Sequence, residues 1–488
     1  MTSPESELRA EPREASRKTL PCLCVDLDGT LIQGDTLIES FIILLGSRPW
    51  RAIQALFWIL RGKARFKHEV ARLVRLQPEL LPYDPAVLEY LKSESSKGRR
   101  LLLVTGANAT IAHSVAEHLG LFSGVICSDA RENVTGKKKL AAILRAVKPE
   151  EFIYAGNSRA DLPVWTQAKG AVVVRAPKSV LKSIQRSGVP VENVFASPKT
   201  SIFMLLKATR VYQWTKNALV LLPLLLSHRF FSLNSLAIGA RAFFAFSLCA
   251  SAVYLANDIL DLPNDRRHSR KKHRALPSGQ LSVPAAVALI AVLLAGCAFL
   301  NPTPAAASLL ALYFVATMAY SLYLKRLLII DVVMLAGFYT VRLLYGGAAT
   351  GVRVSVWTLS FSMFMFLSLA LIKRISELRS GASEDGLENS RRAYQQNDMN
   401  QMSALCAGSG CVAALVIVLY VNSPEVLSLY SRPQLLLAIF PLLVYWQSRM
   451  LILANRGAIS TDPIVFSLQD RASRATALAL LVVVLAAI

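Results

Sequence analysis

The sequence lacks paired cysteines. Its seven cysteines are scattered over 488 residues, with no Cys-x-x-Cys pair and no histidine at metal-ligand spacing. Disulfide frameworks and zinc sites need such spacings, so we expect the cysteines to be buried apolar residues. The first 21 residues also lack an apolar core. We therefore expect no secretory signal there and a first domain that stays in the cytosol.

Acidic residues are few compared with basic ones: 32 Asp and Glu stand against 54 Lys and Arg, a formal net charge of +22. Nucleic acid is the first partner to consider for so basic a chain. The position of the charge argues against it, because the basic run at residues 266–274 lies between two apolar segments. Cations in that place set membrane topology and meet anionic lipid heads. We expect a membrane partner and no nucleic acid.

Long apolar segments are concentrated after about residue 200, and 53% of the whole chain is hydrophobic. By length they predict an all-α membrane bundle of about nine transmembrane helices. The expected spans are 215–233, 235–256, 281–300, 303–323, 329–349, 355–373, 403–422, 431–451 and 473–488. Loops on the side of the first domain carry most of the cations, as the positive-inside rule requires, and an odd number of spans places the C-terminus outside.

Before the membrane part, short β-type runs alternate with helical patterns, which predicts an α/β domain with a parallel sheet. Two apolar stretches, Leu37–Leu45 and Trp50–Leu60, are too short to span a membrane. We interpret them as a small helical cap that rests on the membrane surface. The expected organisation is a disordered tail at 1–19, the α/β domain at 20–198 and the membrane domain at 199–488.

Two acids follow the first predicted strand, Cys22–Leu27, in the run Asp26-Leu27-Asp28-Gly29-Thr30. A strand end with this pattern suits a nucleophilic carboxylate and a second acid beside a bound phosphate. A hydroxyl, a cation and further ligand oxygens come later in the chain, from Thr105, Lys139, and Asn157 with Asp161.

This ordered set resembles the haloacid dehalogenase superfamily of phosphatases over roughly residues 20–190. The resemblance implies that Asp26 is the nucleophile, Asp28 the general acid and base, and Thr105 and Lys139 the phosphoryl contacts. Asp26, Asp28, Asn157 and Asp161 would bind Mg²⁺. Asn157 stands where the family often has Asp, which lowers the negative charge at the metal. An inactive regulatory domain is the alternative, and Lys137 or Lys138 could take the place of Lys139.

A second acidic motif, Asn257-Asp258-Ile259-Leu260-Asp261-Leu262-Pro263-Asn264-Asp265, ends an apolar segment. At about 100° per residue, Asp258, Asp261 and Asp265 would project to one side of one helix and repel one another without a cation. The motif resembles that of the UbiA family of intramembrane transferases. The resemblance implies that these acids bind Mg²⁺ and a diphosphate leaving group, with Asn257 as a further contact to the substrate phosphates.

The late loop carries Lys373, Arg374 and Glu377, where that family has a second aspartate-rich motif. Several stretches resemble the decaprenyl-phosphate phosphoribosyltransferase branch: Gln213–Asn217, Tyr320-Ser321 with Lys325-Arg326, residues 373–378, Asp462–Phe466 and Asp470-Arg471. That branch moves 5-phosphoribosyl from phosphoribosyl diphosphate to a polyprenyl phosphate. Lys216, Lys325, Lys373 and Arg374 are then candidate phosphate contacts, with topology anchors at the lipid surface as the alternative for each.

A phosphatase fused to such an enzyme could remove the 5-phosphate and leave polyprenylphosphoryl ribose, a precursor of cell-wall arabinogalactan or of another glycan. One alternative is prenyl transfer from a polyprenyl diphosphate to an aromatic acceptor, beside an unrelated or inactive first domain. Another is a non-catalytic module that binds lipid phosphates. The resemblance places the protein in a prokaryotic inner membrane. The prenyl chain length stays open, as does the oligomeric state, a homo-oligomer included.

Overall fold

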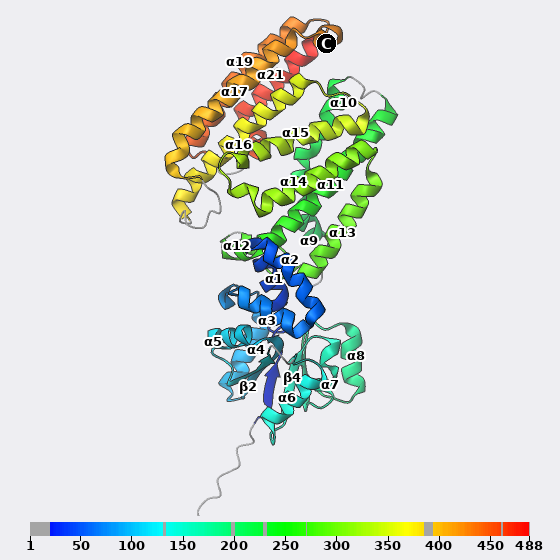
Figure 1. Cartoon of the computed structure of the whole chain (residues 1–488), viewed down its shortest axis with the longest axis vertical. Helices are drawn as coiled ribbons and strands as arrows, with labels where there is room; N and C mark the ends of the chain where they lie inside the picture. Colours follow the sequence, from blue (N-terminus) through cyan, green and yellow to red (C-terminus); the bar gives the residue numbers. More distant parts are fainter. Residues whose placement is uncertain are drawn as a thin grey trace, which may run out of the picture. The chain divides into compact units, whose positions relative to one another are not determined.

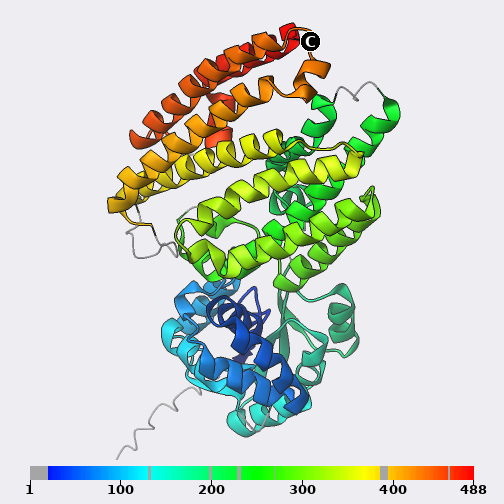
Figure 2. The same ribbon diagram turned by 45° about the horizontal axis from the view of Figure 1, so that its top comes forward.

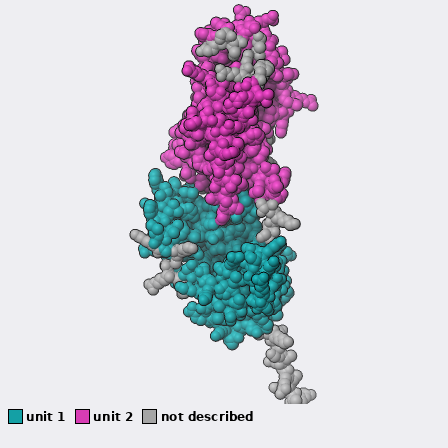
Figure 3. Space-filling model, turned by 90° about the vertical axis from the view of Figure 1, so that its right-hand side faces the viewer, with its two compact units in different colours: residues 1–200, 262–283 teal, residues 201–261, 284–488 magenta. Residues whose placement is uncertain are grey.

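The computed structural model describes residues 20–129, 133–196, 201–227, 232–269, 271–384, 394–459 and 462–487. The chain divides into two compact units (Figure 3). Unit 1 comprises Met1–Thr200 and Leu262–Val283, and unit 2 comprises Ser201–Asp261 and Pro284–Ile488. The tail expected at 1–19 lies outside the described residues. The loop segment Leu262–Val283 belongs to unit 1, whereas the sequence placed it within the membrane domain.

Unit 1 contains a six-stranded parallel sheet with the strand order β3-β2-β1-β4-β5-β6. The predicted α/β fold is therefore confirmed. The strands are β1 Cys22–Val25, β2 Leu101–Asn108, β3 Gly124–Ser128, β4 Phe152–Gly156, β5 Gly170–Val174 and β6 Val191–Phe195. In the register, Val25 lies beside Leu103 on β2 and beside Ala155 on β4. The carboxyl ends of these three strands therefore meet at one edge of the sheet.

Alternate residues of β1 enter two separate apolar cores, because successive strand side chains point to opposite faces. Leu23 and Val25 pack on one face, which α4 (Pro85–Ser96) and α5 (Ala109–Leu119) cover. Cys22 and Cys24 pack on the other face, which α6 (Lys137–Val147), α7 (Leu162–Trp165) and α8 (Lys178–Arg186) cover. This arrangement is visible around β2 and β4 in Figure 1.

All seven cysteines are free thiols, and five are buried as expected, Cys22 and Cys24 among them. Cys127 is half-buried and Cys411 is exposed, so the expectation of burial was wrong for these two. Cys411 lies on a long apolar helix, where an outward side chain meets lipid rather than water, and there a thiol needs no protein core.

A small helical cap follows β1, as predicted. It comprises α1 (Thr36–Ser47), α2 (Pro49–Trp58), η1 (Ile59–Arg61) and α3 (Lys63–Leu73). Asp35 caps α1 by accepting hydrogen bonds from the amides of Leu37 and Ile38, and Pro49 starts α2 at a position that needs no amide donor. Unit 1 also contains η2 (Pro78–Leu80) and η3 (Arg159–Asp161), and in its loop segment α12 (Leu262–Arg267) and η6 (Lys271–His273).

Unit 2 is helical throughout its described part, and its long helices run beside one another in Figures 1 and 2. Its long helices are α11 Leu233–Leu260, α13 Val283–Leu300, α14 Pro304–Leu322, α15 Ile330–Thr350, α16 Val356–Glu384, α17 Met399–Val421 and α19 Ile439–Asn455. Its shorter ones are α9 Ile202–Ala208, η4 Val211–Leu221, α10 Leu222–Leu226, η7 Leu324–Arg326, η9 Gln396–Asp398, α18 Pro424–Leu429, η10 Pro433–Ala438, α20 Pro463–Gln469 and α21 Arg471–Ala487.

Seven helices in the described part of the chain are long and apolar enough to cross a membrane. The spans expected at 215–233 and 473–488 are not among them. The first is divided between η4 and α10, and the second corresponds to α21, which has 17 residues. The protein is an integral membrane protein, and the expected number of nine spans is approximate.

Candidate functional site

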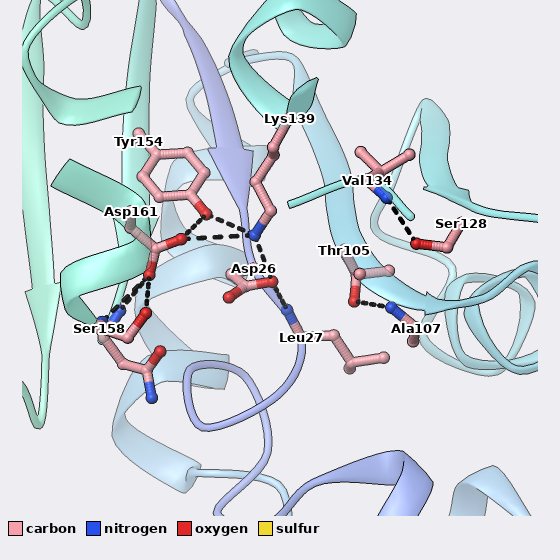
Figure 4. A network of polar contacts seen from close by, with 12 residues as sticks. Asp26, Leu27, Thr105, Ala107, Ser128, Val134, Lys139, Tyr154, Ser158 and Asp161 are labelled. Atoms are coloured by element: carbon pink, nitrogen blue, oxygen red, sulfur yellow. Dashed lines mark hydrogen bonds and ion pairs between the residues drawn. The ribbon is translucent and has the colours of Figure 1, made fainter. Parts of the chain in front are cut away.

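Asp26 lies directly beyond the central strand β1, where its backbone amide donates a hydrogen bond to the carbonyl of Ala155 at 3.0 Å. Figure 4 shows Asp26 between Thr105 on one side and Lys139, Tyr154 and Asp161 on the other. Thr105 is fully buried near the end of β2, and its hydroxyl accepts a hydrogen bond from the amide of Ala107. The edge of the sheet therefore assembles residues from four separate parts of unit 1.

Lys139 is the lysine that reaches this edge. Its Nζ lies 2.9 Å from Asp26 Oδ1 and 2.8 Å from the hydroxyl of Tyr154, and the side chain is buried. Lys137 and Lys138 start the same helix but are exposed. Burial acts to lower the pKa of Lys139, but the charges of Asp26 and Asp161 outweigh burial and raise it. Lys139 therefore keeps its positive charge beside the nucleophile candidate.

Asp161 serves as an acceptor for several protein donors. Its Oδ2 accepts from the amides of Asn157 and Ser158 and from the hydroxyl of Ser158 at 2.9 Å, and its Oδ1 accepts from the hydroxyl of Tyr154 at 2.8 Å. These hydrogen bonds let Asp161 orient its neighbours, and its role as a Mg²⁺ ligand stays a prediction. Tyr154 was not among the predicted site residues, because a tyrosine in an apolar strand has no distinguishing sequence signal.

Asp28 lies in a small pocket that the cap helps to form. Its Oδ1 accepts a 2.7 Å hydrogen bond from the amide of Thr36, the first residue of α1. Burial, together with the nearby charge of Asp35, raises the pKa of Asp28 to about 7. Lys67 of α3 also lines this pocket and donates to the carbonyl of Gly106 at 2.8 Å. Sequence reasoning missed Lys67, since it lies in the cap, far from the recognised motifs.

The residues at this edge suit a hard cation. No group of three His, Cys, Asp or Glu side chains in the described part of the chain forms a ready metal site. The candidate ligands are the carboxylates of Asp26 and Asp161, the carbonyl oxygen of Asp28 and the amide oxygen of Asn157. Asn157 packs so closely on the turn after Asp28 that a Cβ at Gly29 would lie 2.0 Å from its Nδ2. Carboxylate, carbonyl and amide oxygens are the ligands that Mg²⁺ prefers.

The second acidic motif begins at the end of α11. Asp258 is buried and pairs with Arg210, and Asp261 accepts from Lys325 of η7 at 3.1 Å. The side-chain oxygen of Asn257 is buried without a hydrogen-bond partner in the described structure. A buried acceptor without a donor is costly, so this oxygen is suited to a metal ion or a ligand donor.

The sequence suggested that the motif lies on one continuous helix, but the structure divides it between two. Helix α11 ends at Leu260 with Asp261 as its C-cap, and α12 starts at Leu262. Pro263 explains the break, because proline has no amide to continue a helical hydrogen-bond ladder. Asp265 lies on α12 within unit 1, where it is buried and pairs with Arg274 at 2.9 Å.

The cations predicted to bind phosphate in unit 2 have different partners. Lys216 and Lys373 share one carboxylate, with their Nζ atoms 2.7 and 3.6 Å from Asp462 Oδ2. This trio has a net charge of +1. Arg374 instead makes a 2.6 Å ion pair with the fully buried Asp331 and another of 2.6 Å with Glu377. Its binding capacity is largely used within the protein.

Two further charged residues were missed by the sequence reasoning. Arg342 of α15 is buried, donates to Asn217 Oδ1 at 3.1 Å and lies over the rings of Phe246 and Tyr339. In unit 1, Arg266 makes a bidentate pair with Glu39 of the cap, with both distances 2.8 Å. The two partners are 227 residues apart in sequence, so no local pattern could have revealed their pairing.

The model of the UbiA prenyltransferase family matches residues 218–461, and that of haloacid dehalogenase-like hydrolases matches residues 23–165. The uncharacterized protein y4nM of Sinorhizobium fredii is 33% identical over 97% of this chain and 92% of its own. Nodulation protein NoeC of Azorhizobium caulinodans is 29% identical over 55% of this chain and 87% of its own. A decaprenyl-phosphate phosphoribosyltransferase of Mycobacterium tuberculosis is 34% identical over 39% of this chain and 67% of its own. The chain therefore belongs to the UbiA prenyltransferase family and carries a haloacid dehalogenase-like hydrolase domain in its N-terminal part.

Proposed function

We propose that unit 2 transfers a 5-phosphoribosyl group from phosphoribosyl diphosphate to a polyprenyl phosphate, and that unit 1 then removes the 5-phosphate. The observation that carries the proposal is the net positive trio of Lys216, Lys373 and Asp462 in the unit that also holds Asp258 and Asp261. Two lysines that share one carboxylate suit a second phosphate group, which a neutral aromatic acceptor does not have.

In the transfer, an oxygen of the polyprenyl phosphate attacks C1 of the ribose while the bond from C1 to diphosphate breaks. Asp258 and Asp261 would hold Mg²⁺, and Asn257 would contact the diphosphate. Mg²⁺ bound there would neutralise the departing diphosphate. Arg210 pairs with Asp258 and Lys325 with Asp261, and both cations would contact the diphosphate oxygens once the acids bind the metal. Lys216 and Lys373 would hold the remaining phosphate.

In the phosphatase step, Asp26 attacks phosphorus and Asp28 protonates the departing 5-oxygen, which leaves an aspartyl phosphate that water then hydrolyses. A carboxyl group with a pKa of about 7 can give and accept a proton near neutral pH. Lys139 and Thr105 would bind the phosphoryl oxygens. Asp26, the Asp28 carbonyl, Asn157 and Asp161 would hold Mg²⁺, and Asp161 also accepts hydrogen bonds from the amides of Asn157 and Ser158.

We further propose the topology that the cation distribution favours: the α/β domain at 20–198 in the cytosol, the membrane domain at 199–488 in a prokaryotic inner membrane, and the C-terminus outside. Both reactions would then take place on the cytosolic side. A tethered phosphatase would meet a membrane-bound product at high effective concentration.

The test uses detergent-purified full-length protein with Mg²⁺, labelled phosphoribosyl diphosphate and a polyprenyl phosphate, and identifies the lipid product by mass. We expect a ribosylated lipid without the 5-phosphate. The Asp26→Asn variant should accumulate the 5-phosphorylated lipid, and Asp258→Asn should form no ribosylated lipid. If competent protein instead prenylates an aromatic acceptor and ignores phosphoribosyl diphosphate, the proposal is wrong and the general prenyltransferase reaction takes its place.

A further inference from the structure

The cap of unit 1 has an unusual outer face. Trp50, Phe57 and Leu60 are 79%, 66% and 84% exposed, and Ile53, Leu56 and Ile59 are also exposed. Over the described residues between 20 and 196, the other large hydrophobic side chains that are exposed are Leu20 and Val194. Six of eight such residues therefore lie on α2 and η1. We call these six residues the apolar face.

This face is not needed to hold the cap together. The inner side of α2 is formed by the buried Ala52 and Ala55 and the half-buried Trp58, which pack in one cluster with Leu44 of α1 and with Phe66 and Val70 of α3. The exposed large residues point the other way, at positions such as 50, 53, 57 and 60, which a helix places on one side. A single exposed apolar residue is ordinary, but a continuous row of large ones marks a binding surface.

The charge around the face identifies its partner. From Ser40 to His68 the sequence contains six basic residues and no Asp or Glu. Arg48 at the start of α2, Arg51 within it and Arg65 of the next helix, α3, are exposed. An apolar stripe with a purely cationic border, and with tryptophan and phenylalanine in the stripe, has the composition of a helix that lies in the headgroup region of an anionic bilayer. A second copy of the chain would oppose one cationic face with another.

We propose that the apolar face of α2 and η1 inserts into the surface of an anionic lipid bilayer and so holds the Asp28 pocket at that surface. The same cap supplies two groups of the pocket, the amide of Thr36 from α1 and the side chain of Lys67 from α3. A phosphomonoester attached to a lipid is confined to the bilayer surface and would reach the pocket without leaving the membrane. This second part rests on the proposed function of unit 1, whereas the insertion itself does not.

The insertion is tested with full-length protein in nanodiscs that contain phosphatidylglycerol and lipids brominated along their acyl chains. The fluorescence of Trp50 is obtained as the difference between the protein and its Trp50→Phe variant. We expect this difference signal to be quenched at least about twofold by the brominated lipids, because an interfacial tryptophan lies within reach of the upper acyl chain. Fluorescence that is not quenched, with the emission of a residue in water or covered by protein, would overturn the proposal.

A second measurement tests what the insertion does. The triple change Leu56→Glu, Phe57→Glu and Leu60→Glu should abolish the quenching and slow dephosphorylation of the lipid-linked substrate about tenfold. Hydrolysis of soluble p-nitrophenyl phosphate should stay unchanged. Val194→Glu, on another exposed apolar residue of unit 1, is the matched control and should alter neither rate. Equal losses on both substrates would contradict the proposal. Absence of phosphatase activity altogether would count against the proposed function, while the quenching would still report the insertion.

Discussion

The acid sites of the two units use the same charges in different ways. In unit 1, Asp26 meets Lys139 inside a buried network that Tyr154, Ser158 and Asp161 complete through hydrogen bonds of 3.5 Å or less. In unit 2, Asp258 pairs with Arg210 and Asp261 with Lys325, both cations from other elements, and the neighbouring Asn257 oxygen has no hydrogen-bond partner in the described structure. The first site is organised by its own hydrogen bonds, whereas the second depends on ion pairs that a ligand can rearrange.

The site in unit 1 is pre-organised, whereas the site in unit 2 becomes ordered when a ligand binds. A network of hydrogen bonds among buried side chains holds its reacting groups in one geometry. Ion pairs at the end of a helix exchange partners at lower cost, because each cation can turn toward the oxygens of an arriving diphosphate. Substitutions in unit 1 should therefore act mainly on chemistry, while those around α11 should act on ligand binding as well.

The largest expected effect separates the two sites completely. Asp26→Asn should lower phosphatase turnover by about 10³-fold or more, because an amide cannot attack phosphorus as a carboxylate does. Transfer to the lipid should be unchanged. Asp258→Asn should show the opposite pattern, with transfer lost and hydrolysis of p-nitrophenyl phosphate retained. Both rates are measured on the same detergent preparations, and a loss of both activities in either variant would contradict two independent sites.

Within unit 2, adjacent cations should differ in what they stabilise. Arg374→Ala leaves the fully buried Asp331 carboxylate without its ion-pair partner, so we expect the free energy of unfolding to fall by about 3–5 kcal/mol. Lys373→Ala is the matched control: this side chain is 37% exposed and shares Asp462 with Lys216, so the loss should be under about 1 kcal/mol. Thermal unfolding in detergent makes the comparison. Lys373→Ala should instead raise KM for the lipid phosphate. Equal losses of unfolding free energy in the two variants would show that Arg374 and Lys373 do not differ in what they stabilise.

A smaller effect should pass through the cap of unit 1. Arg266→Ala removes the two hydrogen bonds to Glu39 and should cost about 1.5–3 kcal/mol of unfolding free energy. Glu39 lies one turn after Thr36, whose amide holds Asp28, so hydrolysis of a soluble phosphomonoester should slow as well. Arg267→Ala is the control, since Arg267 bonds to Gln77 at an exposed position. Combining Arg266→Ala with Glu39→Ala should cost little more than one change, and additive losses would argue against the pairing.

The same residues show what the sequence could reveal. The strand before Asp26 and the paired acids Asp26 and Asp28 follow from local pattern, and so does the acidic end of α11. The sequence analysis placed the three acids on one helix and so missed the break at Asp261, although Pro263 signals it. The different partners of Lys373 and Arg374 could not be predicted, since neighbouring residues on a helix point about 100° apart and only packing decides which one meets Asp331. The pair of Arg266 and Glu39 is equally nonlocal.

The smallest expected effect concerns Asn157, a candidate Mg²⁺ ligand in unit 1. Asn157→Asp keeps the shape of the side chain that packs on the turn at Gly29, but it adds a negative charge near Asp26. Without metal this charge should lower the unfolding temperature, because like charges repel in a partly buried site. With Mg²⁺ the added charge should raise affinity by about tenfold, since ligand charge tunes the binding of hard cations. The Mg²⁺-dependent rise in unfolding temperature should therefore be larger in the variant than in the unchanged protein.

Asn157→Ala should show a smaller rise than either. An identical response in all three proteins would mean that Asn157 is not a ligand and that Asp26, Asp161 and the backbone of Asp28 bind the cation without it.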